Sequence, residues 1–91
     1  MGGLNGIFKY EGEVGTYGIK DFNEAYKTGF YKIAISGGTI SHRPSNVGYA
    51  VMFVLNTGTY RLQVVFDLFN STACFRAGDG SFNDTWHKFN Q

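Results

Sequence analysis

The sequence predicts one mostly β domain, a small antiparallel meander or sandwich of four to five strands with one or two short helical turns. Three observations support this fold class. The 91 residues suffice for a single domain. Thirteen glycines divide the chain into short runs, and apolar residues within these runs recur at every second position, which is the strand period. With 43% hydrophobic and 16% charged residues, the chain has enough apolar surface to fold, so intrinsic disorder is excluded.

The run 49–55 is the predicted centre of the fold. Every residue in it is apolar, so both faces of this strand need cover from a second layer or from another chain. Residues 56–58 provide a tight connection in which Gly58 can adopt a positive φ. The following run, 59–67, alternates apolar and polar residues. We therefore expect a hairpin whose second strand buries one apolar face, made of Tyr60, Leu62, Val64 and Phe66, and leaves a largely polar face made of Arg61, Gln63 and Asp67.

The remaining elements are shorter. Residues 29–35 and 73–77 are predicted strands that extend the hairpin into a meander. Residues 21–26, which begin with an acidic residue, and 84–89, in which Trp86 and Phe89 are spaced i, i+3, are candidate helical turns. The glycine-rich stretch 1–18 is expected to be an irregular lead-in to a domain over 19–91.

Composition excludes several classes of partner. A net charge of +1 without a basic stripe argues against nucleic-acid binding. The longest apolar run is far shorter than the roughly 20 residues that a membrane helix needs, so no membrane insertion is expected. Cys74 is the single cysteine, which rules out an internal disulfide and fits synthesis in a reducing cytoplasm.

No motif for metal binding or catalysis stands out. His42 and His87 lie far apart in the sequence without neighbouring ligands, and the loop 79–84 lacks the closing glutamate of a calcium loop. Cys74 alternates with apolar residues as a core thiol does. A glycosidase would need a pair of carboxylates at a suitable separation, which Asp67 could form with either Asp21 or Glu24. We therefore expect no enzyme, no cofactor and no metal.

A set of short motifs follows in order between residues 21 and 89. They are Asp21-Phe22-Asn23, Gly29-Phe30-Tyr31, Arg43-Pro44, Gly48-Tyr49, Gln63, Phe75-Arg76 and Trp86-His87-Lys88-Phe89. In this order they resemble the pyocin-knob type of domain found at the ends of phage and prophage tail fibres. The structural signature of the resemblance is Gln63, Arg76, Trp86 and Phe89. Phe89 departs from the family's closing tryptophan, because it keeps the aromatic bulk and lacks the indole N–H.

The resemblance implies a non-enzymatic host-attachment module at the distal part of a tail fibre. It implies a homotrimer that contacts a bacterial surface glycan or another envelope receptor. It also implies a place in the virion, in the tail fibre or baseplate, after assembly in the host bacterial cytoplasm. The alternative is a structural module that trimerises or caps the fibre without touching a receptor. A third, enzymatic, alternative is a fragment of a capsule depolymerase.

Several polar and aromatic residues are candidates for binding. Arg76 and Trp86 are expected to stack and hold the C-terminal segment down; alternatively, Trp86 offers its ring to a sugar while Arg76 donates to hydroxyls. Gln63 is expected to bind neighbouring backbone. Receptor contacts are expected in the loops 56–59 and 78–83. The candidate binding residues are Trp86, Arg76, Arg61, Asn56 and Asp79.

Overall fold

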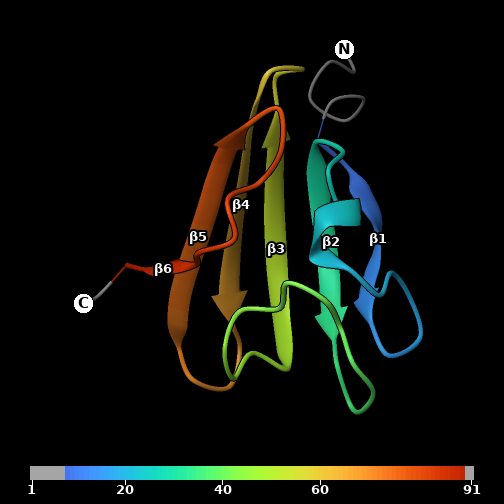
Figure 1. The fold of residues 1–91 in the computed structure, drawn as a ribbon. Helices are drawn as coiled ribbons and strands as arrows, with labels where there is room; N and C mark the ends of the chain where they lie inside the picture. Colours follow the sequence, from blue (N-terminus) through green and yellow to red (C-terminus); the bar gives the residue numbers. More distant parts are fainter. Residues whose placement is uncertain (1–7, 90–91) are drawn as a thin grey trace.

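Six strands form one open, mixed sheet in the computed structural model, which describes residues 8–89 (Figure 1). The strands are β1 (Tyr10–Gly15), β2 (Gly29–Ala34), β3 (Tyr49–Asn56), β4 (Tyr60–Asp67), β5 (Thr72–Asp79) and β6 (His87–Lys88). Their order in the sheet follows the chain, and every pair is antiparallel except β1 with β2. The mostly β class and the meander are confirmed. The expected four to five strands become six, and the described chain forms a single sheet without a second one to complete a sandwich.

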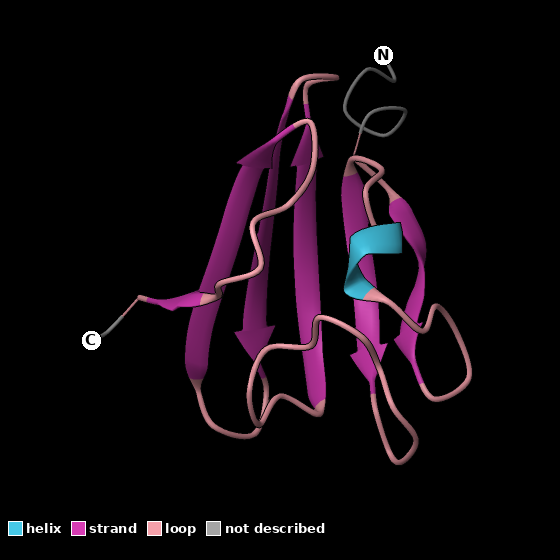
Figure 2. Ribbon diagram, in the orientation of Figure 1, coloured by secondary structure: helices cyan, strands magenta, loops and turns pink. Residues whose placement is uncertain are grey.

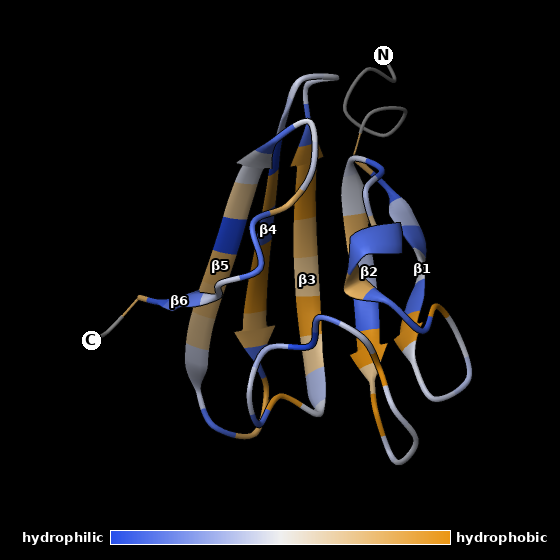
Figure 3. Ribbon diagram, viewed as in Figure 1, coloured by the Kyte–Doolittle hydropathy of each residue, from blue (hydrophilic) through white to orange (hydrophobic). Residues whose placement is uncertain are grey.

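The strands β2 to β5 match the predicted runs closely. The hairpin between β3 and β4 turns at Gly58, whose φ of 98° is the positive value expected there. The short turn between β4 and β5 includes Ser71, which also adopts a positive φ. β3 is hydrophobic along most of its length (Figure 3), as its sequence requires of a strand with apolar side chains on both faces.

β1 corrects part of the expected irregular lead-in over 1–18, of which residues 1–7 lie outside the described residues. Residues 10–15 form an edge strand parallel to β2, and Val14 is fully buried. Its glycines interrupt the apolar alternation by which a strand is recognised in a sequence. Gly15 is nevertheless needed, because a Cβ at this position would overlap the carbonyl oxygen of Ala34. Parallel strands need a crossover of a dozen or more residues, and the segment 16–28 provides it.

The crossover contains the one helical element of the described chain, the 3-10 turn η1 (Phe22–Glu24; Figure 2). Asp21 caps it, because its side chain accepts a hydrogen bond from the backbone N–H of Asn23 at 2.9 Å. The helical turn predicted at 21–26 is therefore confirmed, and the one predicted at 84–89 is wrong. That segment is extended, because residues 87 and 88 pair with β5 as β6. Trp86 consequently packs against the core while Phe89 contacts Phe75 on the other side of the sheet, so they share no face.

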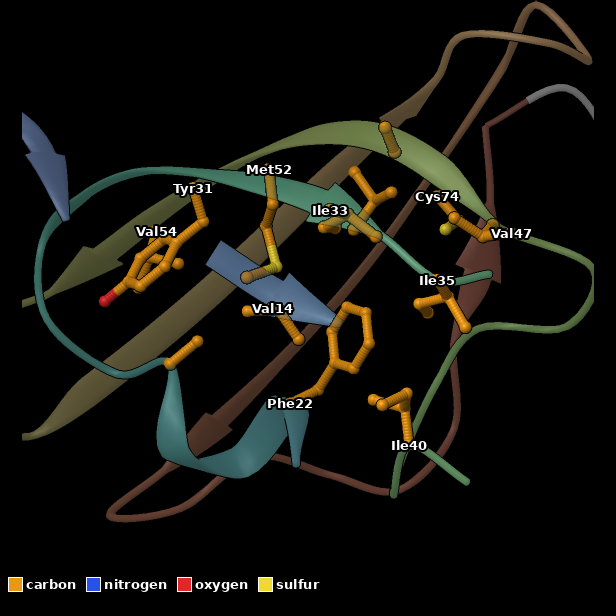
Figure 4. Close-up of a cluster of buried hydrophobic side chains, with 13 residues drawn as sticks. Val14, Phe22, Tyr31, Ile33, Ile35, Ile40, Val47, Met52, Val54 and Cys74 are labelled. Atoms are coloured by element: carbon orange, nitrogen blue, oxygen red, sulfur yellow. The ribbon is translucent and has the colours of Figure 1, made fainter. Parts of the chain in front are cut away.

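The core lies on one face of the sheet, which we call the covered face. Three segments of the same chain cover it: η1, the loop 36–48 and the C-terminal segment 80–88 (Figures 1 and 4). The buried cluster consists of Val14, Phe22, Ala25, Tyr31, Ile33, Ile35, Ile40, Val47, Ala50, Met52, Val54, Val65 and Cys74. The three β3 side chains that were expected to need cover on this side, Ala50, Met52 and Val54, are at most 2% exposed. Within residues 8–89, no helix is long and apolar enough to cross a membrane.

Candidate functional site

A buried polar cluster on the covered face reverses the expected orientation of β4. Gln63 is fully buried and Asp67 nearly so, whereas Phe66 is 43% and Tyr60 64% exposed. The prediction that β4 buries its apolar set and exposes its polar set is therefore wrong. The reversal is possible because the buried polar groups find partners, without which their burial would be costly.

Gln63 and Arg76 lie directly opposite each other on β4 and β5. The Gln63 amide donates to the backbone carbonyls of Phe22 at 2.7 Å and Ala25 at 3.0 Å. Its oxygen accepts a hydrogen bond from Nε of Arg76 at 2.7 Å. The expected contact of Gln63 with neighbouring backbone is confirmed, and it ties η1 to the sheet.

The Arg76 guanidinium lies between two aromatic rings. Its Cζ is 4.7 Å from the ring centre of Phe82 and 4.8 Å from that of Trp86, which confirms the predicted Arg76–Trp86 stacking. Burial lowers the pKa of Arg76 to about 10, against the opposing effect of the negative charges of Asp21 and Asp84. The guanidinium thus remains charged at neutral pH. Because Arg76 is fully buried, it has no exposed surface with which to meet a ligand.

Trp86 fastens the C-terminal segment to the core. Its Nε1 donates to the backbone carbonyl of His42 at 2.9 Å, and its ring meets Phe22 edge-on with centroids 5.8 Å apart. The His42 ring in turn hydrogen-bonds Asp21, the cap of η1, at 2.8 Å. Burial would raise the pKa of Asp21, but hydrogen bonds from Asn23 and His42, together with the charge of Arg76, lower it overall.

The other predicted binding residues gather at the end of the sheet that holds the β3–β4 hairpin. Arg61 lies over the rings of Tyr26 and Phe82, at 5.4 and 5.7 Å. Asn56 lies opposite Arg61 on the neighbouring strand. Its side-chain amide donates to the carbonyl of Tyr26, and its side-chain oxygen accepts from the N–H of residue 58 in the turn. Asp79 is exposed at the end of β5. The loops 56–59 and 78–83 are neighbours, because the N–H of residue 80 donates to the carbonyl of Thr59 at 2.7 Å. Whether these residues bind a receptor stays a prediction.

The opposite side of the sheet, which we call the open face, is the largest feature that sequence reasoning placed wrongly. Strand pairing aligns a row of apolar residues across four strands: Phe30, Phe53, Val64 and Phe75. On this side of β3, β4 and β5 the one charged side chain is Asp79, which lies opposite Tyr60 at the end of β5. The other residues there are uncharged: Tyr49, Val51, Phe53, Leu55, Tyr60, Leu62, Val64, Phe66, Ala73, Phe75 and Ala77. The Phe8 ring packs against Phe30 and Phe53, with centroids 6.0 and 5.5 Å apart, but no segment of the described chain forms a layer over this face. Phe53 and Leu55 are 36% and 50% exposed. The period-two pattern of 59–67 was the signal for this face, but it was assigned to the core.

Both edges of the sheet are partly occupied by the chain itself. At the β1 edge, the N–H of residue 15 donates to the carbonyl of Ile19, and the N–H of Ile19 donates to that of Glu13. At the β5 edge, β6 and the hydrogen bond from Asn83 to Ala77 occupy backbone groups. Occupied edges disfavour strand addition by another chain, so the open face is the larger surface available for association.

A pocket of about 480 Å³ lies on the covered side, beside Trp86. Its walls come from the loop 44–47, the β4–β5 turn and the C-terminal segment. Asp67 and Cys74 line its floor. Burial would raise the pKa of Asp67, but hydrogen bonds from Asn70 and Phe69 lower it overall. Burial, with the nearby charge of Asp67, raises the pKa of the Cys74 thiol to about 11, so this cysteine is not an activated nucleophile.

Within residues 8–89, no group of three or more histidine, cysteine or acidic side chains is placed to hold a metal ion. The two histidines lie on different sides of the sheet: His42 contacts Asp21 on the covered side, and His87 packs against Phe75 on the open face. No protein family, curated protein or solved structure matches the chain. The resemblance described above therefore stands on its sequence motifs alone.

Proposed function

We propose that this chain is a non-enzymatic assembly module of a homo-oligomeric phage fibre or baseplate, joined to its copies through the open face. The observation that carries the proposal is a largely apolar, aromatic sheet face that residues 8–89 leave without a covering layer. This is the structural alternative of the sequence analysis, and the resemblance to tail-fibre knobs supplies the virion setting and the expected homotrimer. Arg76, one of the candidate binding residues, is instead buried against Gln63, and the two residues hold the domain together.

The size of the open face supports this function. The strands β3, β4 and β5 are each eight residues long, so the plane spanned by β2 to β5 measures roughly 26 by 19 Å, about 500 Å². Side chains add relief to that plane. The face is thus of the same order as the ~800 Å² that each partner contributes to a standard interface. This area also falls within the ~300–600 Å² range of the largest apolar patches on monomers, which are often functional.

The charge distribution favours a second copy of the chain over an unlike partner. The charged side chains on this side lie at its borders: Asp79 is exposed at the end of β5, and Lys32 on β2 faces Glu13 on β1 at 3.9 Å. Two or three copies can therefore meet through the middle of β3, β4 and β5 while Asp79 stays in water at the rim. The central row of Phe30, Phe53 and Phe75 provides the large aromatic side chains that dominate interface energies.

Light scattering on three proteins tests the proposal. We expect the wild-type chain to have about three times its 10.1 kDa mass at micromolar concentration. Phe66→Lys, which places a charge on the open face, should lower the mass to that of one chain. Tyr17→Lys, at an 87% exposed position away from this face, should leave it unchanged. A monomeric wild type, or a Phe66→Lys variant that assembles as well as the wild type, would refute the assembly role. A dimer would retain it and overturn the threefold arrangement.

Host attachment, the leading expectation from the sequence, is the second candidate function. The observation that favours it is the pocket beside Trp86, which lies on the side of the sheet that assembly through the open face would leave free. Whole-cell adsorption tests it. Assembled protein that binds host cells supports attachment, and assembled protein that binds neither cells nor envelope polysaccharide refutes it.

A further inference from the structure

The pocket beside Trp86 has the composition of a site for a sugar. We propose that it binds a saccharide, with the partly exposed Trp86 ring against the apolar face of the sugar and amide and hydroxyl side chains bonding its hydroxyl groups. The proposal does not depend on assembly through the open face, and it gives the attachment candidate a ligand class.

The pocket is held in shape by hydrogen bonds from each of its walls. The N–H of Leu68 donates to the carbonyl of Tyr49 at 3.0 Å, which fixes the β4–β5 turn against the start of β3. The N–H of Phe89 donates to Ala73 at 3.1 Å, and the Trp86 indole donates to His42. A cavity of about 480 Å³ with fixed walls is typical of small-molecule sites, because binding then orders little of the protein.

The lining chemistry selects the ligand class. Four neutral side chains that can donate and accept hydrogen bonds line the pocket and are exposed: Ser45, Asn46, Asn70 and Thr72. Such groups match hydroxyls, which also donate and accept. The exposed apolar part is the Trp86 ring, because Pro44 and Val47, which also line the pocket, are themselves buried. An aromatic ring beside amides and hydroxyls suits a molecule with one apolar face and a polar rim, as a pyranose has.

Other ligand classes fit less well. Lys88 is the one cationic side chain in the lining, which is too few for a phosphate-rich ligand. The Asp67 carboxylate is already hydrogen-bonded within the β4–β5 turn, where its oxygens accept from the N–H groups of Phe69 and Asn70 and from the Asn70 amide. It is therefore not expected to bind the ligand. The single free cation would favour a sugar acid over its neutral counterpart.

Trp86 is the only tryptophan in the chain, so its fluorescence reports directly on the pocket. The probes are galactose, N-acetylglucosamine, glucuronic acid and envelope oligosaccharides that contain them, with inorganic phosphate and acetate as ionic controls. We expect a saturable fluorescence change with at least one saccharide and none with the ionic controls. Thr72→Tyr, which fills the pocket, should weaken that binding at least tenfold, and Tyr17→Lys, at an exposed position outside the pocket lining, should leave it unchanged.

Two results would overturn the proposal. One is the lack of a saturable signal with every saccharide, confirmed by calorimetry on the folded protein. The other is a saccharide that binds Thr72→Tyr as tightly as wild type, which would place its site elsewhere. If Thr72→Tyr does not fold, Ser45→Tyr fills the pocket from the opposite loop and serves the same test. Light scattering on the same samples reports assembly separately, so failure of saccharide binding and failure of assembly are distinguishable.

Discussion

Replacing Gln63 by methionine should destabilise the domain by about 3–5 kcal/mol, because it breaks the hydrogen bonds that tie η1 and Arg76 to β4. The change removes two donors to backbone carbonyls, each contributing about 1 kcal/mol. It also leaves the Nε of a fully buried guanidinium without its acceptor, at a further cost of about 1–3 kcal/mol. Together these contributions come to about 3–5 kcal/mol. This is a large share of the roughly 5–14 kcal/mol expected for a chain of this length.

Urea unfolding followed by Trp86 fluorescence measures the effect, at one protein concentration so that assembly contributes equally. The matched control is Tyr60→Phe on the open side of the same strand, which should change stability by less than about 0.5 kcal/mol. The double variant Gln63→Met with Arg76→Met removes both partners and should cost less than the sum of the single changes. A loss below about 1 kcal/mol for Gln63→Met, or strict additivity in the double variant, would refute the role given to this cluster.

Two further predictions concern stability. The pKa values of Asp21 and Asp67 are lowered in the folded state, so both carboxylates stabilise the fold at pH above the ordinary value of 3.8 and lose this contribution as pH falls below it. The unfolding free energy should therefore be nearly flat from pH 7 to 5 and fall below about pH 4. A flat profile down to pH 2 would contradict the assignment. Gly15→Ala should destabilise the domain by about 2 kcal/mol or more, because its Cβ would overlap the backbone of Ala34, whereas Gly37→Ala, where a Cβ meets nothing within 4 Å, is the control and should be tolerated in the same thermal melts.

Sequence patterns were sufficient to locate β2 to β5 but not to orient β4. A period of two shows that a strand has two chemically different faces, and burial is usually assigned to the apolar one. Here the chain folds its loops over the face that carries Gln63, and the aromatic face is left open. Arg76, thirteen residues from Gln63, provides the long-range partner that makes this possible. No local sequence pattern predicts the hydrogen bond between Gln63 and Arg76.

The ends of the domain were hidden for other reasons. β1 contains two glycines, Gly12 and Gly15, of which Gly15 lies where the backbone closely approaches β2. The strand therefore lacks the apolar alternation that identifies a strand. Trp86 and Phe89 fit an i, i+3 helical spacing, but in an extended segment the same spacing sends them to opposite faces of the sheet. The stacking of Arg76 on Trp86 was predictable because it requires two residue types with a strong mutual preference. The pocket could not be predicted, because three loops distant in sequence form it.

Hydroxyl-radical footprinting of the open face tests most directly whether copies of the chain cover it. The comparison is between the wild type and Phe66→Lys, with oxidation followed at Phe53 and at Tyr17, which lies away from this face. We predict that Phe53 is oxidised several-fold more slowly in the wild type than in the variant, while Tyr17 reacts equally in both. Equal oxidation of Phe53 in the two proteins would mean that the open face is bare in solution, and assembly through it would be contradicted.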